Sequence, residues 1–137
     1  MDRISIVVPC YNEEASLPLF YGEVCCVLES MPDIDYELLL INDGSEDNTL
    51  SVIKKLAGDN TKIKYASFSR NFGKEAAMYL GLQKATGDFV VIMDADLQHP
   101  PALLTQMYHA LKTEDIEGKS KRRIGGVRWI NTSPTHM

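Results

Sequence analysis

Residues 89–96 have the sequence Phe89-Val90-Val91-Ile92-Met93-Asp94-Ala95-Asp96, in which five apolar residues run directly into two acids separated by alanine. A short apolar run rich in β-branched residues predicts a buried β-strand. In extended backbone, side chains two positions apart point to the same side, so the carboxylates of Asp94 and Asp96 can face one point. The segment therefore predicts a core strand that ends in a pair of acidic side chains.

Three further apolar runs, at residues 4–8, 36–41 and 63–68, predict three more strands. Between the strands, apolar residues recur three and four positions apart, as on one face of a helix. The expected helices cover residues 14–31, the segment from Ser45 as N-cap to about residue 57, residues 76 to about 87, and a last segment beginning at Pro100-Pro101. This alternation predicts an α/β fold, a Rossmann-like three-layer sandwich with a mostly parallel sheet.

The length of 137 residues fits one domain. No apolar stretch is long enough to cross a bilayer, and the N-terminus lacks the apolar region of a signal peptide, so we expect the chain to begin in the cytoplasm. The formal net charge is −5, and all 19 acidic residues precede residue 118. This acidic body argues against nucleic acid as a partner. A phosphate compound would need a bound cation or well-placed backbone amides.

The segment after residue 115 departs from the alternating pattern. It carries a basic cluster, a Gly125-Gly126 pair and no apolar periodicity that would add another strand and helix. We therefore expect a folded domain over residues 1–115 and a basic, poorly ordered tail over residues 116–137. A basic patch that meets a membrane surface is the alternative for this tail.

Polar residues follow each predicted strand, at the edge of an open α/β sheet where ligands bind. These loops are residues 9–14 (PCYNEE), 42–45 (NDGS), 69–71 (SRN) and 94–98 (DADLQ). Oxygen ligands suit Mg²⁺ or Mn²⁺ rather than zinc, so Asp94 and Asp96 are expected to bind such an ion, with Gln98 adding a neutral oxygen. A solvated turn that happens to use aspartate is the alternative.

Three residues on the first two loops are candidates for contact with a nucleoside. Asp43 can accept a hydrogen bond from an N–H-bearing ring, or it can serve as a turn or helix-capping residue. Tyr11 can stack on a base. Glu13 can accept hydrogen bonds from the base or ribose, or it can cap the start of the first helix.

Three residues on the later loops are candidates for contact with phosphate or substrate. Arg70 and Lys74 have the charge to bind phosphate, although long basic side chains on loops are commonly only solvated. His99 lies beside the acidic pair in the sequence and is a candidate substrate contact. A loop histidine without a role is the alternative.

Together these segments resemble the family 2 glycosyltransferases with the GT-A fold, over roughly residues 3–112. The resemblance rests on residues 8–14 (VPCYNEE), 42–45 (NDGS), 69–74 (SRNFGK) and 94–101 (DADLQHPP). These motifs are most similar to those of the polyprenyl-phosphate branch, which includes dolichyl-phosphate mannose synthases and bacterial undecaprenyl-phosphate glucosyltransferases.

The resemblance implies the nucleotide-sugar-binding half of a GT-A fold. It also implies transfer of a sugar from a UDP- or GDP-sugar to polyprenyl phosphate by a metal-assisted, inverting displacement, at the cytoplasmic face of the membrane in full-length relatives. The implied nucleotide-binding residues are Pro9, Tyr11, Glu13, Asp43 and Asp94, and the implied ligands of Mg²⁺ or Mn²⁺ are Asp94, Asp96 and Gln98. No general base is identified.

Family members continue past the metal motif with more strands and a basic acceptor site, whereas the resemblance of this chain ends near residue 115. We therefore expect a truncated domain, for which a non-catalytic nucleotide-binding remnant is the alternative to an active transferase. Two other classes do not fit. The first strand is not followed by G-x-G-x-x-G, which a dinucleotide-binding domain would need. The residues directly after it, Pro9-Cys10-Tyr11-Asn12, do not supply the paired acids of a receiver domain. The sequence leaves the sugar, the base and the oligomeric state open.

Overall fold

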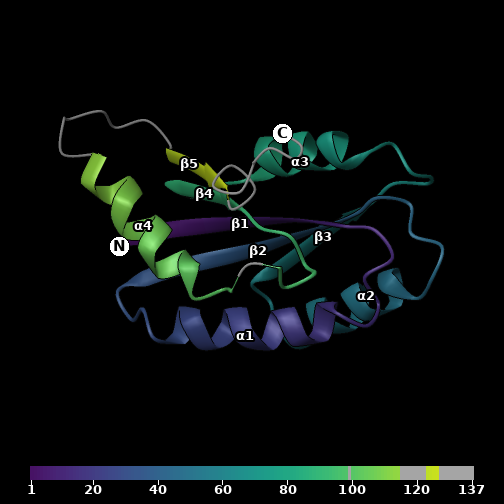
Figure 1. Cartoon of the computed structure of the whole chain (residues 1–137), viewed down its shortest axis with the longest axis horizontal. Helices are drawn as coiled ribbons and strands as arrows, with labels where there is room; N and C mark the ends of the chain where they lie inside the picture. The colour runs from purple at the N-terminus through teal and green to yellow at the C-terminus, as the bar shows by residue number, and fades with distance from the viewer. Residues whose placement is uncertain (99, 115–122, 127–137) are drawn as a thin grey trace.

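A computed structural model describes residues 1–98, 100–114 and 123–126 of the chain and contains one all-parallel sheet. Its strands are β1 (Asp2–Cys10), β2 (Ile34–Asn42), β3 (Ile63–Ser67), β4 (Phe89–Ile92) and β5 (Arg123–Gly126). Their order across the sheet is β3-β2-β1-β4-β5, with every neighbouring pair parallel (Figure 1). The first strand of the chain thus lies in the middle of the sheet.

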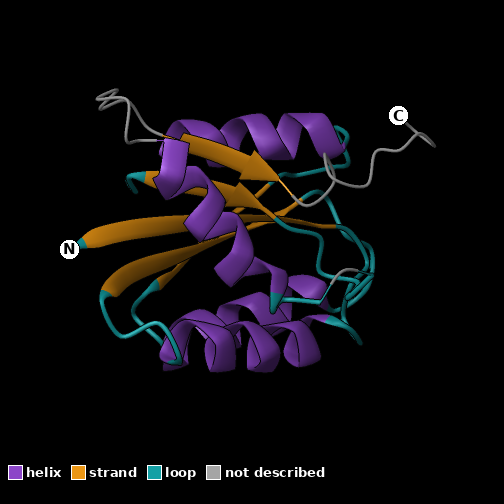
Figure 2. Ribbon diagram, turned by 60° about the vertical axis from the view of Figure 1, so that its left-hand side comes forward, coloured by secondary structure: helices purple, strands orange, loops and turns teal. Residues whose placement is uncertain are grey.

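Helices cover both faces of this sheet (Figure 2). They are α1 (Leu17–Glu29), α2 (Thr49–Asp59), α3 (Lys74–Lys84) and α4 (Leu103–Glu114). On one face, Phe20 of α1, Ile53 of α2 and Leu104 of α4 are buried in a single apolar cluster with strand residues. On the other face, Met78 of α3 packs with Val7 and other strand residues. The predicted α/β three-layer sandwich with a parallel sheet is confirmed.

The sequence predicts four strands, and the structure has a fifth, β5. Residues 123–126 pair with residues 89–92, within the segment expected to be a poorly ordered tail. The run Arg-Ile-Gly-Gly has no apolar pattern that would predict a strand, but pairing it with β4 satisfies backbone groups that an unpaired edge would leave exposed. Most of the predicted tail, residues 115–122 and 127–137, lies outside the described residues.

The start of α2 is a second difference, because Ser45 does not cap it. The helix begins at Thr49, and the Ser45 hydroxyl instead accepts a 3.0 Å hydrogen bond from the backbone N–H of Asn12. The backbone N–H of Glu46, which a helix would leave free near its start, donates to the Asn12 side chain at 2.8 Å. Hydrogen bonds between two loops therefore replace the predicted cap. Helices α1 and α4 also begin later than predicted, at Leu17 and Leu103.

Strand order reverses at β1, which pairs with β2 on one side and β4 on the other. In open α/β sheets, such a reversal opens a crevice at the carboxyl ends of the strands. Cys10 at the end of β1 pairs with Asn42 at the end of β2, so the loops that follow these strands start side by side. None of the described helices is long and apolar enough to cross a membrane.

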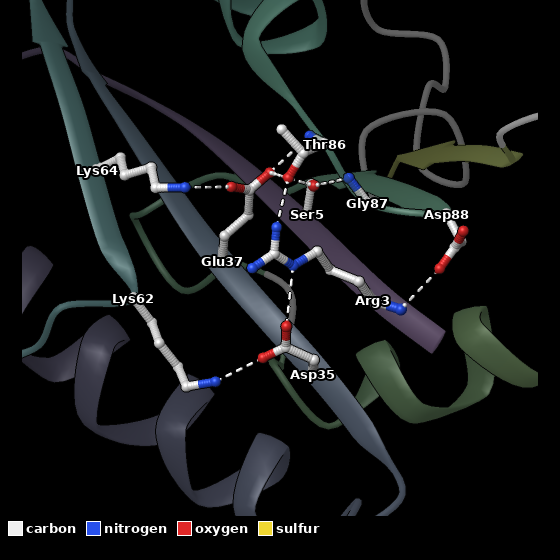
Figure 3. A network of polar contacts seen from close by, with 9 residues as sticks. All are labelled: Arg3, Ser5, Asp35, Glu37, Lys62, Lys64, Thr86, Gly87 and Asp88. Carbon is white, nitrogen blue, oxygen red and sulfur yellow. Dashed lines mark hydrogen bonds and ion pairs between the residues drawn. The ribbon is translucent and has the colours of Figure 1, made fainter. Parts of the chain in front are cut away.

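A buried polar network joins the amino-terminal halves of β1 and β2 to the turn that precedes β4 (Figure 3). The Glu37 carboxylate, almost wholly buried, accepts hydrogen bonds from the Ser5 hydroxyl at 2.6 Å, the Thr86 N–H at 2.7 Å and the Lys64 ammonium at 3.0 Å. The Ser5 hydroxyl in turn accepts one from the Gly87 N–H at 2.8 Å. Burial opposes ionisation, but these hydrogen bonds outweigh it and lower the pKa of Glu37 to about 2. The network fixes where β4 begins, and β4 leads to the acidic pair.

Candidate functional site

One cavity lies at the carboxyl ends of β1, β2 and β4. Its lining residues are Pro9, Cys10, Tyr11, Glu13, Asp43, Lys74, Asp94 and Asp96. Seven of these eight were predicted from the sequence as nucleotide, metal or phosphate contacts, and Cys10 is the addition. Residues at the ends of β1, β2 and β4 and at the start of α3 therefore meet at the point where strand order reverses.

The acidic pair lies on the loop that follows β4. Asp94 is partly buried and Asp96 is exposed. The Asp96 Oδ1 atom accepts a 3.1 Å hydrogen bond from the backbone N–H of Gln98, and Leu97 between them has a positive φ of 62°. Gln98 is exposed and is not among the residues that line the cavity, and its role as a metal ligand stays a prediction.

Lys74 forms an ion pair with this acidic site. Its ammonium Nζ lies 2.6 Å from Asp94 Oδ1, and the two side chains are 49% and 20% exposed. The sequence offered two interpretations of Lys74, a phosphate contact or a merely solvated residue. The structure brings the side chain into the cavity and against a carboxylate.

Negative charge is concentrated around Glu13. Burial is the main cause that raises its pKa, a hydrogen bond from the Ser16 hydroxyl opposes the shift, and the charges of Asp96 and Asp94 add to it. The two aspartates therefore lie close enough to Glu13 to disfavour its ionised form. A cation placed among these groups would relieve that repulsion.

The donor set fits a hard divalent cation better than a soft metal. The acidic groups lining the cavity supply carboxylate oxygens, which Mg²⁺ and Mn²⁺ prefer. Within the described residues, no group of three or more His, Cys, Asp and Glu side chains is arranged to hold a metal ion. Ions of this kind commonly use one or two carboxylates and take the other ligands from water and substrate phosphates. Asp94 and Asp96 could supply the one or two carboxylates that such an ion needs.

Asp43 is 3% exposed and organises the neighbouring loop. Its Oδ1 atom accepts a 2.8 Å hydrogen bond from the N–H of Phe72. Its Oδ2 atom accepts 3.1 Å hydrogen bonds from the N–H of Gly73 and from the Asn71 side chain. The sequence had offered a nucleobase contact or a turn or capping residue. Asp43 lines the cavity and also binds backbone amides of a loop that the sequence did not connect to it.

Gly44 allows that loop to approach closely. It has a φ of +68°, and a Cβ atom on it would lie 2.2 Å from the carbonyl carbon of Arg70 and 2.3 Å from the backbone nitrogen of Asn71. Both the left-handed conformation and the lack of space require glycine. The loop after β2 and the loop after β3 are thus packed backbone to backbone.

Asn12 does not line the cavity but holds its loops together, a role that the sequence did not predict. It adopts a positive φ of 53°, a conformation that asparagine tolerates better than most residues. Its hydrogen bonds with Ser45 and Glu46, together with a 2.8 Å bond from the Glu13 N–H to the Thr49 hydroxyl, join the loops after β1 and β2. The Tyr-Asn-Glu segment is the only signal in the sequence, because these partners lie more than thirty positions away.

Of the three predicted contacts still to be placed, Tyr11 lines the cavity, Arg70 does not, and His99 is not described. The guanidinium carbon of Arg70 stands 4.8 Å from the centre of the Phe72 ring, and Arg70 does not line the cavity. Tyr11 lines the cavity and is 43% exposed, which leaves ring surface open to a stacking partner. His99 lies outside the residues that the structure describes.

Comparison with solved structures relates this fold to sugar transferases. The mannosyltransferase PcManGT from Pyrobaculum calidifontis, solved in complex with GDP-Man and Mn²⁺, aligns with a TM-score of 0.53 and 28% identity, over 69% of this chain and 28% of that one. The model of the family "Glycosyl transferase family 2" matches residues 5–134. The chain therefore belongs to glycosyl transferase family 2.

Curated relatives narrow the comparison. The chain is 48% identical over 103 residues to "Putative glycosyltransferase CsbB" of Bacillus subtilis (strain 168), which covers 75% of this chain and 31% of the relative. It is 43% identical over 105 residues to "Bactoprenol glucosyl transferase" of Shigella phage SfX, which covers 77% of this chain and 34% of the relative. The chain thus spans about a third of the length of these relatives. The family match also runs past residue 115, where the resemblance was expected to end.

Proposed function

We propose that this chain binds the nucleoside diphosphate part of a sugar donor in the cavity at the carboxyl ends of β1, β2 and β4. The observation that carries the proposal is the meeting of Asp94 and Asp96 with Tyr11, Glu13 and Asp43 in that one cavity. A donor of this kind has a base, a ribose and a diphosphate. The cavity has an exposed tyrosine ring for the base and carboxylate oxygens that could accept from the base or ribose and hold a cation on the diphosphate. UDP- and GDP-sugars are the donor classes.

Asp94 and Asp96 would hold Mg²⁺ or Mn²⁺ on the diphosphate, with Gln98 within two residues as a further oxygen donor. The bound ion would act as a Lewis acid that stabilises negative charge on the diphosphate leaving group. Tyr11 presents its ring to the base, and Glu13 accepts from the ribose or base. The carboxylate of Asp43 keeps the loop over residues 71–73 in place and has remaining capacity to accept from the base.

The acceptor that we propose for the complete protein is a polyprenyl phosphate, in line with the bactoprenol transferase among the relatives. An acceptor phosphate oxygen forms a bond to the anomeric carbon as the bond from that carbon to the diphosphate breaks, with inversion. A phosphate monoester has a second pKa of about 6, so it is largely dianionic near neutral pH and requires no strong general base. Such a reaction belongs at the cytoplasmic face of the membrane.

Calorimetric titration of the chain with UDP-glucose and GDP-mannose, each with and without Mn²⁺, tests the donor site. We expect one donor to bind, and to bind measurably only when Mn²⁺ is present. The proposal fails if neither donor binds under either condition.

A non-catalytic nucleotide-binding domain is the second candidate, because the predicted residues that line the cavity are candidates for binding a donor and its metal rather than an acceptor. A transfer assay with polyprenyl phosphate and a free-hydroxyl sugar as competing acceptors separates the two. Metal-dependent donor binding without transfer by the chain favours the non-catalytic domain. A free-hydroxyl sugar that proves the better acceptor contradicts the proposed acceptor class.

A further inference from the structure

The ion pair between Lys74 and Asp94 places a cation where the proposed metal would bind. Asp94 Oδ1, which lies 2.6 Å from the Lys74 ammonium, is one of the few carboxylate oxygens available to a divalent ion in this cavity. An oxygen in such close contact with an ammonium is obstructed for coordination to a metal ion. Lys74 and a metal therefore compete for the same carboxylate.

The position of Lys74 is set by the loop before it. Lys74 is the first residue of α3 and follows Gly73, which has a φ of +105°. The N–H groups of Phe72 and Gly73 are bound by the Asp43 carboxylate. The backbone of this loop is thus anchored to the end of β2, and the side chain of Lys74 extends from a fixed point toward the end of β4.

The Lys74 ammonium lies among an excess of negative charge in the cavity. Lys74 is the one basic residue among those that line the cavity, against four acidic residues. Its positive charge reduces the repulsion among these four carboxylates. That repulsion is present at Glu13, where the charges of Asp94 and Asp96 disfavour the ionised form. A lysine side chain is a flexible stem with a compact charge, so it can leave one anion for another within reach.

We propose that Lys74 is a built-in counter-ion that occupies Asp94 in the metal-free protein and moves to the donor's diphosphate when Asp94 takes a divalent cation. This inference rests on the proposed donor site. It has two consequences. Lys74 weakens binding of the metal alone, and it strengthens binding of the nucleotide once the metal is present. The metal and the nucleoside diphosphate therefore bind cooperatively. The metal releases Lys74 from Asp94 for the diphosphate, and the diphosphate draws Lys74 away from the carboxylate that the metal needs.

The test compares Lys74→Met, which keeps the length of the stem without the charge, with Lys84→Met at the other end of α3, which is exposed and does not line the cavity. Binding of Mn²⁺ alone is measured from the electron paramagnetic resonance signal of the free ion. Binding of UDP and GDP is measured by calorimetry in saturating Mn²⁺. Thermal unfolding verifies that both variants fold.

For Lys74→Met we expect Mn²⁺ alone to bind about three- to tenfold more tightly than to the unmodified chain, as expected for removal of one competing charge. We expect the nucleotide to bind about tenfold more weakly in the presence of Mn²⁺. Lys74→Arg keeps the charge and should leave Mn²⁺ binding weak, while Lys84→Met should change neither affinity.

Unchanged or weaker binding of Mn²⁺ alone by Lys74→Met overturns the counter-ion role, and so does unchanged nucleotide binding in saturating Mn²⁺. Failure of the donor-site proposal has a different signature, namely that the unmodified chain binds neither UDP nor GDP with Mn²⁺. In that case the comparison of Mn²⁺ alone still decides whether Lys74 competes for Asp94.

Discussion

The Asp43 carboxylate accepts a 2.8 Å hydrogen bond from the backbone N–H of Phe72, which lies 29 positions further along the chain. A second oxygen of the same carboxylate accepts from the next amide, at Gly73. Because Lys74 follows directly, this contact between the loops after β2 and β3 determines where α3 begins beside the cavity.

Asp43→Asn should therefore destabilise the fold as well as the site. The amide NH₂ group would face backbone N–H donors, which leaves buried donors unsatisfied at a cost of about 1–3 kcal/mol in the free energy of unfolding. Urea denaturation measures this cost. The exposed Asp59→Asn is the matched control and should change stability by less than about 0.5 kcal/mol. Equal stability of the two variants would show that Asp43 does not hold the loop.

Gly44→Ala should be poorly tolerated. The added Cβ would meet the backbone of Arg70 and Asn71 at 2.2–2.3 Å, in a left-handed conformation. We expect a loss of about 1–3 kcal/mol in stability. Gly58→Ala in α2 is the control, since nothing lies within 4 Å of its Cβ position, and it should stabilise the chain by about 0.5–1 kcal/mol. Thermal denaturation of both variants decides the point, and a neutral Gly44→Ala would contradict the close packing of the two loops.

Asp94→Asn and Asp96→Asn should each reduce Mn²⁺-dependent binding of the nucleotide by at least about tenfold, because a neutral amide is a weaker ligand than a carboxylate. Calorimetry with and without Mn²⁺ measures the effect. Asp33→Asn, an exposed aspartate outside this cavity, is the control and should bind as the unmodified chain does. Mn²⁺-dependent binding that survives both site substitutions would remove these aspartates from the metal site.

Glu37 predicts a pH dependence of stability. Its folded pKa of about 2 lies below the ordinary value of 4.5, so its contribution is fully present above pH 4.5 and is lost as pH falls toward 2. That contribution amounts to at most roughly 3 kcal/mol. Urea midpoints measured from pH 5.5 to 3 should fall more steeply for the unmodified chain than for Glu37→Gln.

Glu29→Gln is the control for this pH series, because Glu29 is exposed at the end of α1. It should follow the pH profile of the unmodified chain. If Glu37→Gln follows that profile as well, the buried network is not the source of the acid sensitivity.

The apolar runs were sufficient to predict β1 to β4 and the parallel sheet. For β1, β2 and β4 the reason is burial on both faces, which favours apolar residues along the strand. The edge strand β3 is largely exposed and follows this rule only at Ile63. The same reasoning placed Asp94 and Asp96 at one edge together with Tyr11, Glu13 and Asp43. That part of the site depends only on where the strands end, which local sequence reveals.

The remaining features depend on partners far away in the chain. Ser45 has the local sequence of a helix cap, yet it binds Asn12, and no local pattern contains that information. For Lys74 the sequence offers a phosphate contact or a solvated lysine, and its ion pair with Asp94 depends on the Asp43 contacts that hold the start of α3. Strand β5 forms from a sequence without strand character because the edge of β4 offers it backbone partners.

The central position of β1 also shapes how the chain can fold. Its partner β2 begins about thirty residues later, but its other partner, β4, begins only at residue 89. During synthesis, β1 emerges before both of its partners and keeps one edge open until β4 has been made, and it is the strand on which both halves of the sheet are built. Substitutions in β1 should therefore slow folding and promote aggregation more than equally buried substitutions in β3.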